Sequence, residues 1–453
     1  MRASDDRLRD RRILTLAIPA LGSLAVEPLY TLVDTAIVAH LGRAPLGGLA
    51  LAVTVLGTGF WIFHFLQEGT TTEVAMRWGR NDRRQVADTT VQALWLALLL
   101  GVAAAAMIAS GGPLLTRLLG GHGEVQRAAV TYLRISAIGV PMLFVSLVGH
   151  GFLRGVEDVK ATVPVVIVAN VVNVILEVLL VNVWHTGVAG SAWGTVVAQA
   201  IACVWLMVLM WRRLRGTAPA RLGPLPHQWR RLIRVGGWML IRTGLLVGMF
   251  ALATNAAARK GDEVLGGHQI AYQVFILLAL STDALAVSAQ TLTGTLLGAG
   301  DGDELRALMK RLWRMTWVVG GALTVVVAAL AYPVGHLLAP DGATAHVAVI
   351  GILGVAVMQL PAGAAFLTDG QLMGASDFRF LATAMALSAA VYAPLWALVA
   401  WRRDLGITEI WGTLVVMMLL RGVLGWHRSR HRSAASSDGQ HHHTGIISGV
   451  AQP

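Results

Sequence analysis

The sequence predicts an all-α integral membrane protein in which twelve transmembrane helices form two six-helix lobes related by pseudo-two-fold symmetry. The 453 residues are 55% hydrophobic and only 13% charged, whereas soluble domains carry about 25% charged residues. Twelve apolar segments approach the roughly 20 residues that cross a bilayer as a helix. The second half of the chain also repeats motifs of the first half at a constant offset, which aligns Gly79 with Gly298.

The apolar segments define the spans in chain order. The first run, Ile13 to Leu41, is too long for a cleaved signal peptide, so we expect it to stay in the membrane as a span. The six expected spans of the first half are 13–38, 46–69, 89–110, 129–151, 161–183 and 190–211. Those of the second half are 232–257, 265–290, 312–334, 345–368, 379–401 and 407–426.

The internal repeat covers several spans in the same order. The paired segments are 46–48 with 265–267, 79–82 with 298–301, 155–158 with 374–377, and 193–197 with 411–415, the last one residue out of step. Six spans per half is an even number, which predicts parallel repeats about an axis normal to the membrane, as in transporters. The predicted organisation is an N-terminal lobe at 1–211, a basic cytoplasmic linker at 212–234, a C-terminal lobe at 235–427 and a disordered cytoplasmic tail at 428–453.

The net charge of +11 is distributed as the positive-inside rule requires. Arginines cluster in the 212–234 connection, after the second span and after the last span, whereas 184–190 has no Lys or Arg. The pair Arg402 and Arg403 is an exception. This pattern predicts a multi-pass plasma-membrane protein with both termini in the cytoplasm, and it argues against a nucleic-acid partner. Cys203 is the only cysteine, so no intrachain disulfide can form.

Asp34 is the most informative residue, because it lies inside the first apolar run. An ionised carboxylate in hydrocarbon costs about 2.5–3.5 kcal/mol even on insertion scales, and such residues usually serve ion or proton movement. Glu27 lies two helical turns earlier, on the same face. It is either an accessory acid or an interfacial neutralising group. Pro19 and Pro28 on the same span could provide a bend.

The fifth span carries a polar stripe formed by Asn170, Asn173 and Glu177 at i, i+3 and i+7. Two amides and a carboxylate can ligate Na⁺ or share a proton, whereas asparagines alone would more often join helices by hydrogen bonds. Thr195 adds a hydroxyl among the small residues of the sixth span. His64 and Glu68, one turn apart in the second span, could relay protons or serve packing.

The second half lacks this pattern. At the repeat offset, Asp34 maps near Ala253, Asn173 onto Tyr392 and Glu177 onto Trp396. The polar residues expected at membrane depth there are Arg242, His268, Asp283 and Asp369. No phosphate-binding G-x-x-x-x-G-K-[ST] loop, H-E-x-x-H or G-x-S-x-G motif occurs, so no enzyme activity is expected.

Several segments resemble the multidrug and toxic compound extrusion (MATE) family, most closely its DinF-like branch. They are EPLYTLVDTAIVAHLG, FLQEGTTTEVAMRWGRND, FLRGVEDVKATVPVVIVANVVNVILE, GVAGSAWGTVVAQ and LGGHQIAYQVFILLALSTDALAVSAQTLTGTLLGAGD. The resemblance implies two six-helix lobes, alternating access, and a cation-binding cluster at Asp34, Asn173, Glu177 and Thr195. Glu177 replaces a shorter Asp common in the family, and Gln67-Glu68 replaces an Arg and a neutral residue.

The sequence therefore predicts a secondary antiporter that exports organic, cationic or amphiphilic compounds in exchange for H⁺ or Na⁺, without any other cofactor or metal. We expect a monomer whose partners are the bilayer and a small organic substrate. Glu27, His64, Glu68, Asn170 and Asp283 are candidate accessory or substrate-contacting residues. Two alternatives stay open: a flippase for a lipid-linked precursor, which would need a large basic cavity, and a non-transporting membrane scaffold.

Overall fold

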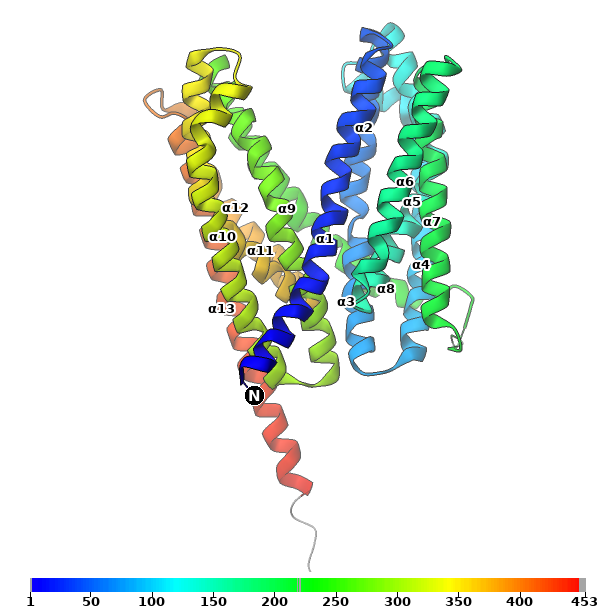
Figure 1. The fold of residues 1–453 in the computed structure, drawn as a ribbon, viewed down its shortest axis with the longest axis vertical. Helices are drawn as coiled ribbons and strands as arrows, with labels where there is room; N and C mark the ends of the chain where they lie inside the picture. Colours follow the sequence, from blue (N-terminus) through cyan, green and yellow to red (C-terminus); the bar gives the residue numbers. More distant parts are fainter. Residues whose placement is uncertain (1, 218, 220, 448–453) are drawn as a thin grey trace, which may run out of the picture. The chain divides into compact units, whose positions relative to one another are not determined.

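The described part of the chain is helical and contains no strand. The computed structural model describes residues 2–217, 219 and 221–447, and it describes their side chains except at 2–4, 27–30, 32, 228 and 431–447. A spanning segment has no water to satisfy its backbone N–H and C=O groups, so it pairs them within a helix. The predicted fold class is confirmed (Figure 1).

The chain divides into two compact units. We call Ile18–Gly237 the N-unit, and Met1–Ala17 together with Trp238–Pro453 the C-unit. Two helices contribute residues to both units, α1 (Arg2–Ala39) and α8 (Pro226–Ala258). Each unit is described by itself below.

The N-unit contains two spans that are built from more than one helical element. The second span is divided at His64, and the fifth begins as a 3₁₀ turn and ends as a π-helix. The elements are α2 (Arg43–Phe63), α3 (Phe65–Gly79), α4 (Arg83–Leu118), α5 (Gly123–Gly155), η1 (Val159–Ala161), α6 (Thr162–Glu177), η2 (Val178–Val183) and α7 (Val188–Leu214).

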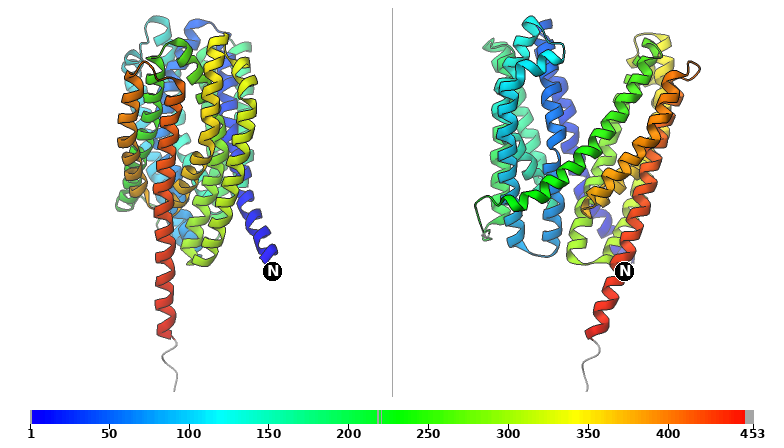
Figure 2. Two further views of the ribbon diagram at one scale, coloured as in Figure 1. Left: turned by 90° about the vertical axis from the view of Figure 1, so that its left-hand side faces the viewer. Right: turned by 180° about the vertical axis from the view of Figure 1, so that it is seen from behind.

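The C-unit is built from long, uninterrupted helices, which Figure 2 shows from two further sides. After α8 they are α9 (Asp262–Ala299), α10 (Gly302–Leu338), α11 (Gly342–Gly374), α12 (Phe378–Trp401) and α13 (Ile407–Ile447). Eleven segments of the described chain are long and apolar enough to cross a membrane. Together with the 38-residue α1, they account for the twelve predicted spans.

The unit boundary differs from the predicted lobe boundary at the N-terminus. The sequence predicts residues 1–211 as one lobe, but the structure places Met1–Ala17 in the C-unit. Ion pairs hold this segment there: Arg9 donates to Glu304 of α10 at 2.7 Å, and Arg311 donates to Asp10. In each pair one partner lies near the start of the chain and the other in its second half, so a segmentation based on hydropathy cannot find them.

The predicted repeat is visible in matching turns. Asn81 and Gly300 both adopt positive φ, and so do Glu157 and Ser376, each pair lying at the repeat offset. After the first of these turns, equivalent aspartates cap the next helix: Asp82 accepts from the Gln85 N–H at 3.0 Å, and Asp301 accepts from the Glu304 N–H at 2.9 Å. The two units therefore reuse the same turn and cap chemistry.

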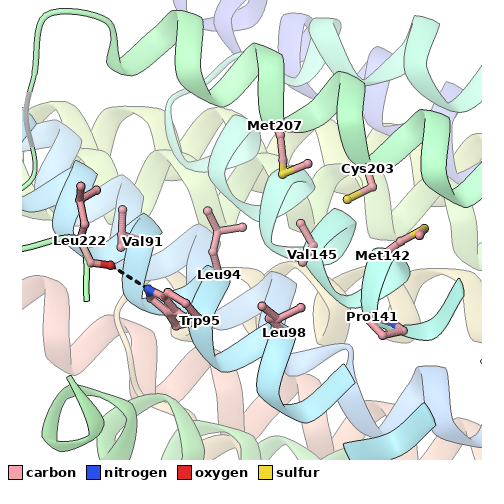
Figure 3. A pocket seen from close by; sticks show the side chains of 10 residues that line it. All are labelled: Val91, Leu94, Trp95, Leu98, Pro141, Met142, Val145, Cys203, Met207 and Leu222. Atoms are coloured by element: carbon pink, nitrogen blue, oxygen red, sulfur yellow. Dashed lines mark hydrogen bonds between the residues drawn. The ribbon is translucent and has the colours of Figure 1, made fainter. Parts of the chain in front are cut away.

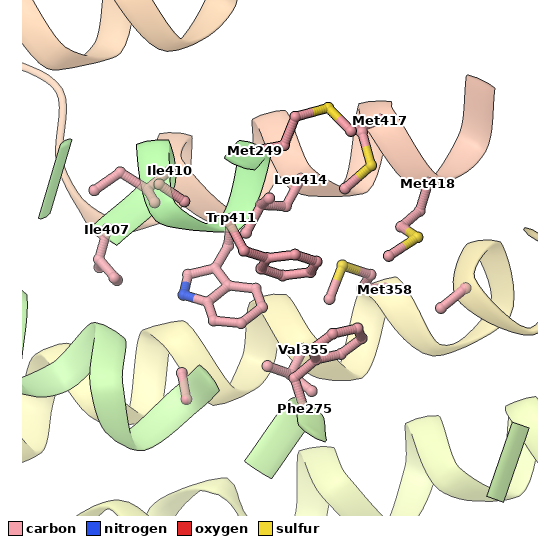
Figure 4. Packing of buried hydrophobic residues seen from close by; sticks show 14 of the residues in the cluster. Met249, Phe275, Val355, Met358, Ile407, Ile410, Trp411, Leu414, Met417 and Met418 are labelled. Atoms are coloured by element: carbon pink, nitrogen blue, oxygen red, sulfur yellow. The ribbon is translucent and has the colours of Figure 1, made fainter. Parts of the chain in front are cut away.

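Trp411 of α13 lies at the centre of the C-unit core and is 1% exposed (Figure 4). Phe275 of α9 meets its ring edge-on at a centroid distance of 6.5 Å. Gly354 of α11 gives the indole room, because a Cβ there would lie 2.7 Å from the Trp411 Cβ. Methionines 249, 358, 417 and 418 fill the remaining space around these rings.

The described part of the C-terminal segment is helical, whereas the sequence predicts a disordered tail at 428–453, of which 448–453 lie outside the described residues. Helix α13 continues to Ile447. Extending an existing helix adds one hydrogen bond for each residue fixed, whereas nucleating a new helix is unfavourable. A segment joined directly to the last span can therefore prolong its helix.

Candidate functional site

A buried polar cluster lies in the N-unit, where α1, α6 and α7 contribute one or two side chains each. Asp34 of α1 is 3% exposed and accepts a hydrogen bond from the Ser191 hydroxyl of α7 at 2.8 Å. Asn173 of α6 donates its amide to the Thr195 hydroxyl of α7 at 3.2 Å. Thr195 in turn donates to the Ser191 backbone carbonyl at 3.2 Å. We call Asp34, Asn173, Glu177, Ser191 and Thr195 the acidic cluster.

Glu177 is the most deeply buried member of the acidic cluster, with 0% exposure. Neither of its carboxyl oxygens accepts a hydrogen bond from a described residue. The Asp34 carboxyl and the Ser191 hydroxyl are its polar neighbours. The backbone changes from α-helix to π-helix directly after Glu177, and such π segments are frequent at functional sites.

Small residues of α7 allow it to approach α6 and η2 closely. A Cβ at Gly190 would lie 2.9 Å from the Cβ of Leu180, which is closer than packed side chains allow. A Cβ at Gly194 would already touch the backbone N of Glu177 at 3.4 Å. Small residues at helix interfaces bring polar side chains of neighbouring spans within hydrogen-bonding range. The small residues of the segment Gly190–Gly194 therefore set the distance between α7 and α6 at the acidic cluster.

Ser191 and Tyr132 belong to this site although sequence reasoning did not select them. Ser191 lies one turn before Thr195 on the same face of α7, so helical periodicity could have identified it. Tyr132 of α5 is 3% exposed, and its hydroxyl lies near Thr195, Ser191 and the two acids. Its place depends on the packing of α5 against α7, which no local pattern in the sequence reveals.

The cluster brings carboxylate, amide and hydroxyl groups together without a basic partner. No salt bridge among the described residues reaches Asp34 or Glu177, and no group of three His, Cys, Asp or Glu is spaced for a transition metal there. Oxygen donors of this kind suit a hard cation such as Na⁺, and the carboxyls can instead hold a proton. The acidic cluster can therefore bind a small cation, and its own net charge changes when it does so.

Other predicted residues lie outside the acidic cluster. The Asn170 amide donates to the Val166 carbonyl of its own helix at 2.7 Å. The Glu27 side chain lies outside the described residues. His64 and Glu68 do meet, at 3.2 Å across the break between α2 and α3. Arg154 of α5 approaches the same Glu68 oxygen at 3.5 Å, which makes a second buried polar group.

The C-unit has a buried ionic group of different composition. Asp369 of α11 accepts from Arg242 of α8 at 2.5 Å and from Arg421 of α13 at 2.6 Å. The side chains of Arg421 and Asp369 are 2% and 10% exposed. Two guanidinium groups thus share one carboxylate. Asp283 of α9 is half-buried, and His268 is hydrogen-bonded to Thr254 at 3.1 Å.

Comparisons with known proteins agree on one family. The MatE family model matches residues 19–179 and 239–398, one stretch in each half of the chain. Protein DETOXIFICATION 44, chloroplastic, of Arabidopsis thaliana is 30% identical over 425 residues, covering 91% of this chain and 81% of that protein. DNA damage-inducible protein F of Escherichia coli K12 is 28% identical, covering 91% of this chain and 90% of that protein.

Solved structures support the same fold. A crystal structure described as MATE in the bent conformation superposes with a TM-score of 0.87 at 19% identity, covering 95% of this chain and 97% of that one. A structure of a MOP superfamily transporter from Pyrococcus furiosus gives a TM-score of 0.85 at the same identity. The family model and the aligned relatives together establish that this multi-pass membrane protein belongs to the multidrug and toxic compound extrusion (MATE) family of transporters.

Proposed function

We propose that the protein is a secondary antiporter that exports organic, cationic or amphiphilic compounds in exchange for H⁺ or Na⁺. The observation that carries this proposal is the acidic cluster. Asp34 and Glu177 lie together at 3% and 0% exposure in spanning helices. Such burial is costly for carboxylates without a basic partner, and cation binding would offset the cost.

Cation binding at this cluster would change the packing of three helices. Two neighbouring carboxylates repel one another, so a proton or Na⁺ between them stabilises their approach. Protonation of Asp34 would remove its charge and change it from an acceptor only into a donor toward the neighbouring oxygens. Because Asp34, Glu177 and Ser191 come from α1, α6 and α7, the arrangement of these helices would follow cation occupancy. Alternating access coupled to an ion gradient requires such a link.

The remaining parts of the proposal follow from charge distribution and family membership. The arginine clusters support a plasma-membrane location with both termini in the cytoplasm. A monomer with no nucleic-acid partner and no cofactor other than the coupling ion is sufficient for this function. Among the accessory candidates, His64 and Glu68 are supported by their contact at the α2–α3 break. Glu27, Asn170 and Asp283 stay candidates on sequence grounds.

Transport by purified protein in liposomes tests this function. A fluorescent organic cation should accumulate in inverted vesicles when an outwardly directed H⁺ or Na⁺ gradient is imposed, and each gradient is applied separately to identify the coupling ion. We expect Asp34→Asn to reduce gradient-driven accumulation to the level of protein-free liposomes. Undiminished accumulation by Asp34→Asn would overturn the assignment of Asp34 as the coupling carboxylate.

One observation favours the flippase alternative. Arg242 and Arg421 of the C-unit both contact Asp369, and guanidinium groups on spanning helices would suit the phosphate of a lipid substrate. In the same liposomes, a flippase would translocate a polyprenyl diphosphate-linked sugar and would not accumulate organic cations. The two substrates therefore distinguish the two functions.

A further inference from the structure

An apolar groove of about 640 Å³ lies in the N-unit between α4 and α7, with α5 behind it (Figure 3). Leu98 of α4, Met142 of α5 and Met207 of α7 are among its lining side chains. The volume is within the range of about 300–1,000 Å³ that small-molecule sites occupy. Leu98 and Met207 are 40% and 42% exposed, so the groove is open at its mouth.

One end of the groove is closed by the connection between α7 and α8, which hydrogen bonds hold in place. The Trp95 indole N–H donates to the Leu222 carbonyl at 2.8 Å, as Figure 3 shows. Gln92, 2% exposed, donates to the Gly223 carbonyl at 2.9 Å and accepts from the Leu225 N–H at 2.7 Å. These three bonds keep Leu222, and with it the preceding Arg221, beside the groove.

This end of the groove carries exposed arginines. Cys203, Met207 and Trp211 follow one another at intervals of four, so they form one stripe along α7, and Arg215 follows directly after the last residue of this helix. The stripe passes from the groove lining to Trp211, which is 63% exposed, and then to Arg215, whose guanidinium lies 5.6 Å from the Trp211 ring centroid. Arg221 is exposed next to the lining residue Leu222. Asp88 of α4 is the nearest acid along that helix.

We propose that this groove binds one acyl chain of an anionic glycerophospholipid, with the lipid phosphate at Arg215 and Arg221. A hydrocarbon chain matches a lining whose indole N–H is already hydrogen-bonded. Tryptophan is favoured at the boundary between lipid tails and headgroups, where Trp211 would lie. Basic residues at the end of a groove between spanning helices favour negatively charged headgroups over zwitterionic ones. This site is separate from the acidic cluster and does not depend on the coupling ion.

Native mass spectrometry of the full chain in detergent tests the proposal. Phosphatidylglycerol and phosphatidylcholine with identical acyl chains are titrated separately, and the lipid-bound fraction is measured. The wild-type protein should retain phosphatidylglycerol preferentially. The double variant Arg215→Gln/Arg221→Gln should lower the affinity for phosphatidylglycerol by about 30-fold, because each basic residue contributes about one fivefold factor. Affinity for phosphatidylcholine should fall much less, because its choline offsets the phosphate charge, so the preference between the two lipids should shrink.

Matched variants separate headgroup and groove effects. Leu98→Trp should fill the mouth and reduce retention of both lipids, whereas Val318→Trp, at a 65% exposed position of α10, should change neither. Arg215→Lys/Arg221→Lys keeps the charge and should keep the preference. Arg379→Gln/Arg403→Gln removes two exposed charges from the C-unit and should have no effect. Equal retention of the two lipids by the wild type, or unchanged phosphatidylglycerol binding by the Gln double variant or Leu98→Trp, would overturn the proposal.

Discussion

Asp34, Asn173 and Glu177 of the N-unit correspond at the repeat offset to Ala253, Tyr392 and Trp396 of the C-unit. The C-unit residues belong to or pack against the apolar core around Trp411, where Ala253 and Tyr392 are each 1% exposed. The same scaffold positions therefore hold an alanine and two aromatic residues in one unit, and two acids and an asparagine in the other. The fold does not require polar groups at these positions, so the acids of the N-unit must be kept for another reason.

The buried acids of the two units also differ in their partners. Asp369 of the C-unit is held by Arg242 and Arg421, at 2.5 and 2.6 Å. Asp34 accepts a hydrogen bond from the Ser191 hydroxyl, and it forms no salt bridge with a described residue. A carboxylate fixed by two guanidinium groups is poorly placed to exchange a small cation. One without a basic partner can bind and release it. Under the proposed function, Asp369 has a structural role and Asp34 has the ion-coupling role.

The largest expected effect is on stability, from removing the structural acid. Asp369→Ala leaves two guanidinium groups buried without their shared carboxylate, and breaking such a group costs about 3–5 kcal/mol. Thermal unfolding in detergent measures the loss. Asp34→Asn is the matched variant, and its unfolding temperature should stay near that of the wild type. Equal losses in both variants would remove the distinction between the two acids.

The second-largest expected effect is a difference in stability between alanine substitutions of the two repeat-related tryptophans. Trp411 is 1% exposed in the C-unit core, whereas Trp193 is 45% exposed. Trp411→Ala should destabilise the protein by about 3 kcal/mol, mainly through the cavity it creates, because apolar lipid reduces the transfer contribution. Trp193→Ala should change unfolding little. A comparable effect at Trp193 would mean that the two units pack this motif alike.

The shared helix caps should behave equally in both units. Asp82→Ala and Asp301→Ala each remove a cap bond to the N–H three residues ahead. Each substitution should cost about 1 kcal/mol. Measured against Asp82→Asn and Asp301→Asn, which preserve an accepting oxygen, the losses should match. If one cap substitution cost clearly more stability than the other, the symmetry between the units would extend to the backbone turns but not to the energy of the caps.

The smallest expected effect concerns pH. The Thr344 backbone N–H and then its hydroxyl hold the pKa of Asp341, at the start of α11, below its ordinary value of 3.8. Because the folded-state pKa is lowered, this stabilisation is present above the ordinary value and is lost as the pH falls through the lowered one. His122 is the repeat-related residue at the start of α5, and its side chain makes no cap bond. Asp341→Asn should reduce the acid sensitivity of the unfolding temperature, and His122→Asn should not.

Much of the fold could be predicted because hydropathy, charge distribution and the internal repeat can be read directly along the sequence. They locate the spans and the matching aspartate caps. Periodicity together with family resemblance selects Asp34, Asn173, Glu177 and Thr195. The structure brings these four residues into one cluster with Ser191. Tyr132 and the Arg242–Asp369–Arg421 group depend on packing between distant helices. The placement of Met1–Ala17 in the C-unit likewise depends on ion pairs between the start of the chain and α10.

Infrared difference spectroscopy of buried carboxyl groups tests the central claim most directly. Purified protein is taken through a pH change, and separately through a Na⁺ change, while the carbonyl band of protonated carboxylic acids is recorded. We predict a band whose response is lost in Asp34→Asn and altered in Glu177→Gln, but is retained in Asp283→Asn of the C-unit. A response that persists in Asp34→Asn and Glu177→Gln and disappears in Asp283→Asn would contradict the assignment of cation coupling to the acidic cluster.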